Sequence, residues 1–356
     1  MGTKIAVYTI ALNEEKHVKR WYEATKDADY HLIADTGSTD KTIEIAKSLG
    51  INVYSIFVKP FRFDDARNAA LALLPSDIDI CVSLDMDEIA SEGFIQGLRD
   101  VWQEDATRAW VWWDTGQRWK NNNRVHRRDG IKWIKPCHEV TTYFGDFVEG
   151  GLPQKILDTE LLVHHKPDDT KSRGHYLGLL KMAVEEAPED ARMWAYLTRE
   201  YFFHKNWKKV IESAESMMKA GGWYVERASV CRAAGEAYRQ FKNMEKAKDW
   251  FLKGVQEAPD QLEGWFCLAQ FAYETKNWQG CWDAANKITT LERQIHYLVD
   301  DSVWSWRCYD LLSISGWYLG KKEEALKFAE IAAKANPKDE RLQNNLKWIK
   351  ENSANI

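Results

Sequence analysis

The chain has 356 residues, a formal net charge of −5, and a composition that is 45% hydrophobic and 29% charged. This length predicts two domains, and the composition is typical of globular chains rather than of long disordered ones. The negative charge excludes a globally basic nucleic-acid-binding protein, and no apolar run is long enough for a transmembrane helix. The six cysteines are scattered and include no Cys-x-x-Cys pair, so we expect reduced thiols and a cytoplasmic protein.

The first half alternates short β-rich runs with helical stretches, a pattern typical of an α/β domain with a mainly parallel sheet. We expect strands at 4–12, 31–37, 51–58 and 78–85, with helices at 18–26, 41–49 and 65–74 between them. Polar residues follow these strands, and ligands of open α/β sheets bind beyond the carboxyl ends of the strands. The pattern therefore predicts one ligand site in a domain that spans residues 1–168.

Residues 169–356 are expected to be helical and to contain a repeated pattern. A small or apolar residue opens the second helix of each unit, and these residues are Tyr176, Val210, Ala247, Cys281 and Ala325. Their spacings are 34, 37, 34 and 44 residues, and a helix-turn-helix period of 34 is typical of tetratricopeptide (TPR) repeats. We expect an all-α, TPR-like domain, with an insertion near 289–306 that accounts for the longest spacing.

The strongest local motif is Asp85-Met86-Asp87-Glu88, which follows a fully apolar strand. Carboxylates two residues apart in extended chain point to the same side, so Asp85 and Asp87 can reach one ion. Hard divalent cations such as Mg²⁺ and Mn²⁺ prefer oxygen ligands and accept substrate phosphates in their remaining positions. A solvated acidic turn is the simpler interpretation of such a motif taken alone.

Four sequence blocks in the first 90 residues favour a metal site over a solvated acidic turn. They are TIALNEE (9–15), ADTGSTDKT (34–42), FDDARNAAL (63–71) and SLDMDE (83–88). In this order they resemble the family-two, GT-A-fold glycosyltransferases, which use nucleotide-sugar donors. The resemblance implies a Rossmann-like GT-A domain before the TPR-like domain. It also implies a role for each matching residue: Ile10, Ala11 and Asp35 at the nucleotide base, Asp85 at the ribose, Arg67 near the base or diphosphate, and Asp87 on the metal.

A second cluster is His138-Glu139, which follows a stretch of alternating character and resembles a His-Glu block in family members that carry TPRs. His138 would contact phosphate or metal. Inverting sugar transfer needs a carboxylate that deprotonates the acceptor, and Glu139 is our candidate ahead of Glu88. The usual Glu-Asp pair of the family is not found here, and a structural contact to a neighbouring loop is the alternative role for Glu139.

A third cluster is His164-His165 at the end of the last strand of the first domain. Related TPR-bearing enzymes have a histidine here, and His165 matches best. A neutral imidazole can complete a Mn²⁺ shell beside Asp87. The alternative is a strand-end histidine that is hydrogen-bonded to the backbone.

Residues 118–135 contain seven basic residues against Asp129 alone, interleaved with Trp119 and Trp133. Such a stretch can bind a nucleic-acid strand, a sugar ring or a diphosphate. The simpler interpretation is a solvated β-hairpin beside the acceptor cleft. Trp119 and Trp133 are the candidate acceptor residues, because their indole rings could stack on a sugar or a base.

Together these features predict a metal-dependent, inverting glycosyltransferase of the hexosyl or N-acetylhexosaminyl type, with Mn²⁺ or Mg²⁺ as cofactor. Because Asp35 matches the base-binding acid of the family, the expected donor is a UDP-sugar. The acceptor would be held between the two domains and could be a peptide or protein, a saccharide or a modified nucleic acid. The alternative is a TPR interaction scaffold whose GT-A domain is not catalytic.

Overall fold

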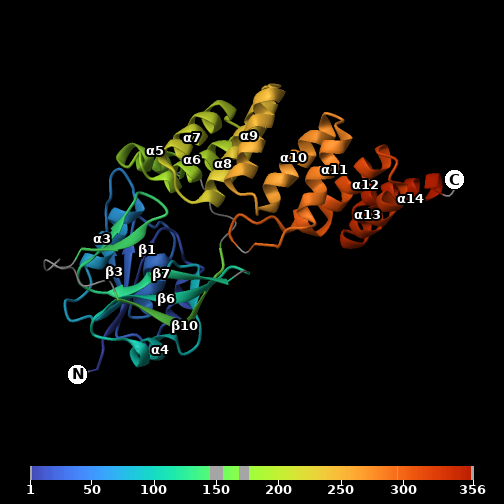
Figure 1. The fold of residues 1–356 in the computed structure, drawn as a ribbon. Helices are drawn as coiled ribbons and strands as arrows, with labels where there is room; N and C mark the ends of the chain where they lie inside the picture. The colour runs from blue at the N-terminus through green and yellow to red at the C-terminus, as the bar shows by residue number, and fades with distance from the viewer. Residues whose placement is uncertain (1, 117, 145–154, 168–175, 295, 354–356) are drawn as a thin grey trace. The chain divides into compact units, whose positions relative to one another are not determined.

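The computed structural model describes residues 2–116, 118–144, 155–167, 176–294 and 296–353 (Figure 1). The chain divides into two compact units, Met1–Leu179 and Leu180–Ile356. The boundary expected from the sequence, between residues 168 and 169, lies outside the described residues. No helix in the described part of the chain is both long enough and apolar enough to cross a bilayer.

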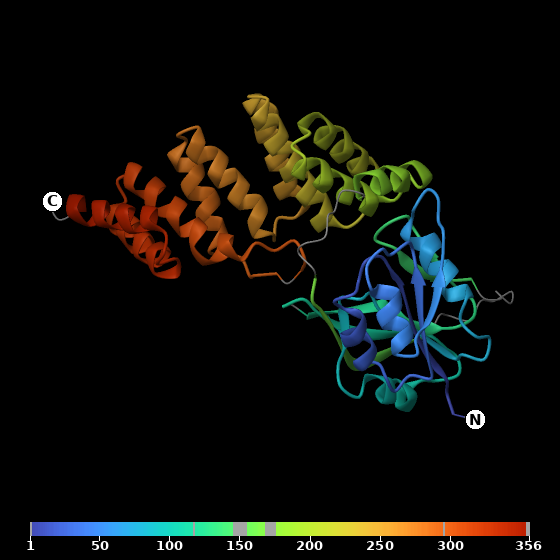
Figure 2. The same ribbon diagram turned by 180° about the vertical axis from the view of Figure 1, so that it is seen from behind.

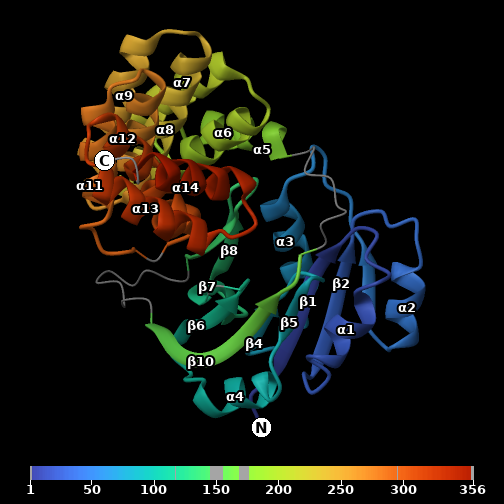
Figure 3. The ribbon, with the colours of Figure 1, turned by 90° about the vertical axis from the view of Figure 1, so that its right-hand side faces the viewer.

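A twisted eight-stranded sheet forms the centre of the first unit, with the order β3-β2-β1-β4-β7-β6-β10-β5 among the described residues (Figure 3). Its strands are β1 (Ile5–Ala11), β2 (Tyr30–Asp35), β3 (Asn52–Ser55), β4 (Ile80–Ser83), β5 (Glu88–Ala90), β6 (Ala106–Asp114), β7 (Arg118–Arg127) and β10 (Lys155–His165). The first four strands pair in parallel, so the predicted α/β architecture is confirmed. Their carboxyl ends lie at one edge of the sheet.

Side-chain alternation along β1 explains how the sheet is covered on both faces. Ile5 and Val7 pack in one core with helices α1 (Val18–Glu23), α2 (Thr42–Ser48) and α4 (Phe94–Val101). Ala6 and Tyr8 point the other way, into a second core with α3 (Phe63–Ala72) and the short strand β8 (Ile131–Ile134). A strand that is buried on both faces has to be apolar throughout, which is why residues 5–8 are a continuous hydrophobic run.

The basic stretch at 118–135 is not a β-hairpin, so that expectation was wrong. Strand β7 lies between β4 and β6 and is antiparallel to both. Strand β8 instead pairs with β9 (Val140–Tyr143) in a separate two-stranded sheet. Strand β6 immediately precedes β7 in the chain, but the other partner, β4, is distant in sequence, and local alternation carries no information about a distant partner.

A buried polar network links the central sheet to β8. The Tyr8 hydroxyl lies 2.9 Å from Nε2 of His126, and the Trp133 indole N–H donates to the same hydroxyl at 2.8 Å. The His126 Nδ1 is 2.7 Å from the Arg127 carbonyl oxygen, so Nδ1 donates and Nε2 accepts from Tyr8. Neutral His126 satisfies every polar contact of its ring.

We expect His126 to make this protein acid-sensitive. Burial lowers the pKa of His126 to about 4, whereas an unfolded histidine titrates near 6.5. Between these values the unfolded chain binds a proton that the native protein does not. The free energy of unfolding should therefore fall as the pH falls from about 6.5 to about 4, by up to about 3 kcal/mol from this group. Urea denaturation of the intact chain at pH 7 and pH 5 measures the change.

The His126→Gln variant should be less stable at pH 7 but should lose less stability between the two pH values. His164→Gln is the matched control, because the His164 side chain is 40% exposed and its substitution should leave the wild-type slope. An unchanged slope in His126→Gln would contradict this account.

The second unit is an array of antiparallel helix pairs (Figures 1 and 2). Its helices are α6 (Ala191–Phe203), α7 (Trp207–Ala220), α8 (Tyr224–Gln240), α9 (Met244–Glu257), α10 (Leu262–Glu274), α11 (Trp278–Ile288), α12 (Cys308–Tyr318), α13 (Lys322–Ala335) and α14 (Glu340–Ser353), preceded by α5 (Tyr176–Glu186), which begins in the first unit. From α6 to α14, each helix packs on its chain neighbour. The TPR-like repeat architecture is thus confirmed.

Three turns within the helix pairs share one design, a lysine with positive φ followed by an asparagine that caps the next helix: Lys205-Asn206, Lys242-Asn243 and Lys276-Asn277. Each asparagine side chain accepts a hydrogen bond from the backbone N–H three residues later, which satisfies a donor that the helix start leaves open. One helical turn further on are Val210, Ala247 and Cys281, and none of them is exposed. The spacing in the sequence therefore marks the start of each second helix.

The insertion after α11 consists of a loop and a π-helix, η1 (Val303–Arg307), which continues directly into α12. The loop folds back on earlier repeats. The Tyr297 hydroxyl donates to the buried Glu226 carboxylate of α8 at 2.6 Å, and the Asp300 backbone N–H donates to Glu263 of α10 at 2.9 Å. The long spacing between repeats is thus accommodated by a packed loop.

Candidate active site

The carboxyl ends of β1 and β2 bring three predicted residues together. The parallel register places Ile10 beside Ala34 and Ala11 beside Asp35. The Asp35 carboxylate is buried and accepts hydrogen bonds from the backbone N–H groups of Gly37 and Ser38, each at 3.0 Å. Asp35 therefore orders the turn that follows β2, at the edge of the sheet where a ligand of an α/β fold binds.

Two arginines hold Asp85 between them. Arg67, which is 3% exposed on α3, donates to Oδ1 of Asp85 at 2.7 Å, and Arg124 of β7 donates to Oδ2 at 3.0 Å. Arg67 also donates through Nε to Glu139 at 2.5 Å. Although burial opposes it, the charges of Arg67 and Arg124 hold the pKa of Asp85 well below its usual range. Both oxygens of Asp85 are therefore committed to ion pairs.

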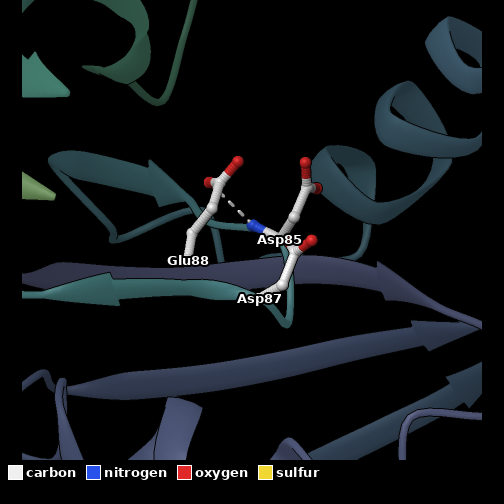
Figure 4. A group of neighbouring side chains, drawn as sticks. All are labelled: Asp85, Asp87 and Glu88. Atoms are coloured by element: carbon white, nitrogen blue, oxygen red, sulfur yellow. Dashed lines mark hydrogen bonds between the residues drawn. The ribbon is translucent and has the colours of Figure 1, made fainter. Parts of the chain in front are cut away.

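Glu88 is enclosed in the same network. One of its oxygens accepts from Arg124 and the other accepts from the Asp85 backbone N–H at 3.0 Å, a contact drawn in Figure 4. The side chain is 1% exposed, and burial raises its pKa well above the ordinary value for a glutamate, against the opposing charge of Arg124. Glu88 therefore serves to position its neighbours.

The turn before Glu139 has an unusual backbone. Lys135 and His138 have φ values of +80° and +50°, in the left-handed region that costs a non-glycine residue energy. The turn is tied to α3, because the Phe63 backbone N–H donates to the Pro136 carbonyl at 2.9 Å. This conformation places Glu139 against Arg67, so two segments distant in sequence meet at one carboxylate.

Asp87 is the member of the acidic cluster that pairs with neither arginine in the described structure. Single ligand atoms of Asp85, Asp87 and Glu88 lie within 4.8 Å of one another (Figure 4). The Asp87 carboxylate lies 3.4 Å from Nε2 of His165, at the end of β10. Two adjacent ligands of an octahedral ion at about 2.1 Å are about 3 Å apart. The Asp87–His165 separation is compatible with two adjacent ligands of such an ion, whereas Asp85 and Glu88 are already engaged by arginines.

A cavity of about 320 Å³ opens beside this network, and its size is that of a small-molecule site. Six of the predicted residues line it: Arg67, Asp85, Trp133, His138, Glu139 and His165. Five others do not contribute to its lining: Ile10, Ala11, Asp35, Asp87 and Trp119. The site therefore has two parts, the strand ends with Asp87 and the cavity with Glu139.

The two tryptophans proposed for the acceptor occupy different environments. Trp119 is 41% exposed on β7, opposite Trp113 of β6. Trp133 is 1% exposed, and the Arg67 guanidinium lies 5.0 Å from the centre of its ring. The exposed ring of Trp119 can stack on the ring of a ligand, whereas the buried ring of Trp133 makes a cation–π contact with Arg67.

Several lining residues were not named as site residues in the sequence prediction. They are Phe63, Trp113, Asn121, Asn123, Arg124 and Tyr176, the last within the first unit. A register shift between β6 and β7 at Ala109 and Val111 breaks the alternation of side chains. Counting residues from the end of the strand therefore does not predict on which face of the sheet Arg124 lies. The nearest signal was the excess of basic residues in β7.

Comparison with known proteins identifies the first unit. Residues 6–151 match the model of the family described as glycosyl transferase family 2. The first unit therefore contains a glycosyl transferase family 2 domain, and Asp35, Arg67, Asp85, Asp87 and Glu139 lie within the matched residues. His165, on β10, lies beyond them. No curated protein matches the chain.

The chain also resembles solved structures, and three of these matches each cover about half of this chain. They include MamA, at 14% identity over 46% of this chain and 89% of that one, with a TM-score of 0.38. YrrB, a TPR protein, is 14% identical over 49% of this chain and 83% of that one, with a TM-score of 0.38. Pseudomonas aeruginosa pilF is 14% identical over 47% and 70%, with a TM-score of 0.39. These likenesses are low, and the repeat architecture described above rests on the helix pairs themselves.

Proposed function

We propose that this protein is a metal-dependent glycosyltransferase that moves a sugar from a UDP-sugar donor to an acceptor, with inversion at the transferred carbon. The observation that carries the proposal is the Asp87–His165 pair at the carboxyl edge of a glycosyl transferase family 2 sheet. In this proposal Ile10, Ala11 and Asp35 bind the base. Asp85 lies at the ribose and Arg67 near the base or diphosphate.

Asp87 and His165 would hold Mn²⁺ or Mg²⁺, which would neutralise the charge that develops on the departing diphosphate. Glu139 is the proposed general base, because its carboxylate lines the cavity, is 11% exposed and is held in place by Arg67. The carboxylate would remove the proton of the acceptor hydroxyl while the acceptor oxygen forms the new glycosidic bond. Glu88 is a weaker candidate because both of its oxygens already accept hydrogen bonds.

Calorimetry with UDP tests the proposal. We expect UDP to bind at least about tenfold more tightly with Mn²⁺ than in the presence of a chelator, because the ion bridges protein carboxylate and diphosphate. ADP carries the same diphosphate and serves as the matched ligand, so weaker binding of ADP supports a uracil site. Mass spectrometry of incubations with UDP-sugars should then detect slow donor hydrolysis. The absence of metal-dependent heat with either nucleotide would favour a scaffold over an enzyme.

A further inference from the structure

The charges in the cavity beside Glu139 are balanced before any ligand enters. The cavity lining contains two arginines, Arg67 and Arg124, and both are ion-paired. Their partners Asp85, Glu88 and Glu139 also line the cavity, so three carboxylates face two guanidinium groups. The carboxylates of that lining therefore outnumber its arginines, so an incoming anion would add a further negative charge, which is costly when buried.

Two asparagines of β7 supply the cavity with hydrogen-bond donors. The side-chain oxygen of Asn121 accepts from the Asn123 backbone N–H at 2.8 Å. The side-chain oxygen of Asn123 accepts from the backbone N–H and the hydroxyl of Thr141, at 3.0 and 3.1 Å. Because both amide oxygens are engaged by the chain, each residue has its NH₂ group to offer to a ligand. Both residues line the cavity.

Aromatic rings form another part of the lining. The rings of Phe63 and Tyr176 are 6.1 Å apart, and the His138 ring is 5.7 Å from that of Tyr176. Apolar ring surface together with a few directed polar groups is the usual composition of a small-molecule site. A sugar ring suits it, because C–H groups can pack on aromatic rings while hydroxyl oxygens accept hydrogen bonds.

We propose that this cavity receives the transferred sugar, and that Asn121 and Asn123 select a neutral hexopyranosyl group over an anionic uronate. This inference rests on the proposed function and adds the chemical class of the sugar. The amide NH₂ groups bind ring or hydroxyl oxygens of the sugar. The charges of the two arginines are already outweighed by three carboxylates, so a uronate would add a further uncompensated negative charge.

Binding measurements on the intact protein with Mn²⁺ test the inference with UDP, UDP-glucose and UDP-glucuronate. We expect UDP-glucose to bind at least about tenfold more tightly than UDP-glucuronate. The uronate would lose hydrogen bonds in the cavity and would bury an unpaired charge. Asn121→Asp and Asn123→Asp keep the oxygen that the chain uses and replace the NH₂ donor with an acceptor. Each should weaken UDP-glucose about tenfold relative to UDP.

Asn122→Asp is the matched control, since it adds the same charge between the two positions at a residue outside the cavity lining. Its affinities for UDP and UDP-glucose should equal those of the wild type. Retained UDP binding in the other two variants shows that they are folded. If UDP itself does not bind, the proposed function fails and this inference fails with it. If UDP binds but both sugars bind equally, or the variants match the control, the inference alone is overturned.

Discussion

Replacing Arg67 with alanine is expected to lower the free energy of unfolding by about 3–5 kcal/mol and to abolish sugar transfer. The side chain is 3% exposed and makes ion pairs with Asp85 and Glu139. Its removal leaves the Glu139 carboxylate, itself 11% exposed, without the cation beside it. Burial of an uncompensated charge is what makes the loss of one partner so costly. Urea denaturation and donor hydrolysis measure the two effects.

Arg67→Lys should not rescue the variant, because one ammonium group cannot reproduce the fork through which Nε and Nη2 bind two different carboxylates. Arg99→Ala is the matched control. Arg99 pairs with Asp29 at 2.8 Å, but the two side chains are 24% and 41% exposed, so its loss should cost at most about 1 kcal/mol. An Arg67→Ala protein as stable as Arg99→Ala would contradict the assigned role of Arg67.

Asp87→Asn should reduce sugar transfer by about 10³-fold and remove the effect of Mn²⁺ on UDP binding, while stability changes little. An amide is a much poorer ligand for a hard divalent cation than a carboxylate. The fold should tolerate the change because the Asp87 side chain is 26% exposed and its backbone oxygen still accepts from the Lys166 N–H at 2.8 Å. Calorimetry and single-turnover assays provide the readouts.

Glu92→Gln is the control for the loss of one negative charge, since Glu92 is exposed on the loop that follows β5. It should retain wild-type metal dependence. Persistence of Mn²⁺-dependent UDP binding in Asp87→Asn would place the metal elsewhere, or remove it from the mechanism.

The sequence was most informative where local patterns decide the structure. Residues 5–8 and 80–82 are continuous apolar runs, and each became part of a strand buried on both faces. The repeated spacing of Val210, Ala247 and Cys281 marked the helix pairs, because one buried position per second helix is set by helical periodicity. Four of the residues named for the site's chemistry, Asp85, Asp87, Glu139 and His165, lie in one region of the first unit, although their roles remain predictions.

The sequence was least informative where distant segments meet. The sequence motif Asp85-x-Asp87 does not distinguish its two carboxylates. In the structure Asp85 forms ion pairs with two arginines, whereas Asp87 lies beside His165. Arg124 belongs to a basic stretch that suggests a solvated surface, but its side chain is 12% exposed because β7 is inserted between β4 and β6. Trp133 was named as a candidate acceptor residue, and only the structure shows that its ring is 1% exposed and contacts the Arg67 guanidinium.

The sequence by itself therefore determined that this protein has an α/β unit with polar strand ends, an acidic motif at one of them and a helical repeat array. These properties follow from the alternation, periodicity and composition of short segments, each of which is read over a few residues. Only the tertiary structure decided which carboxylates pair with arginines, which one faces His165 and which asparagines line the cavity. Those assignments depend on strand order, on the register shift between β6 and β7 and on burial, which arise from contacts between residues far apart in the chain.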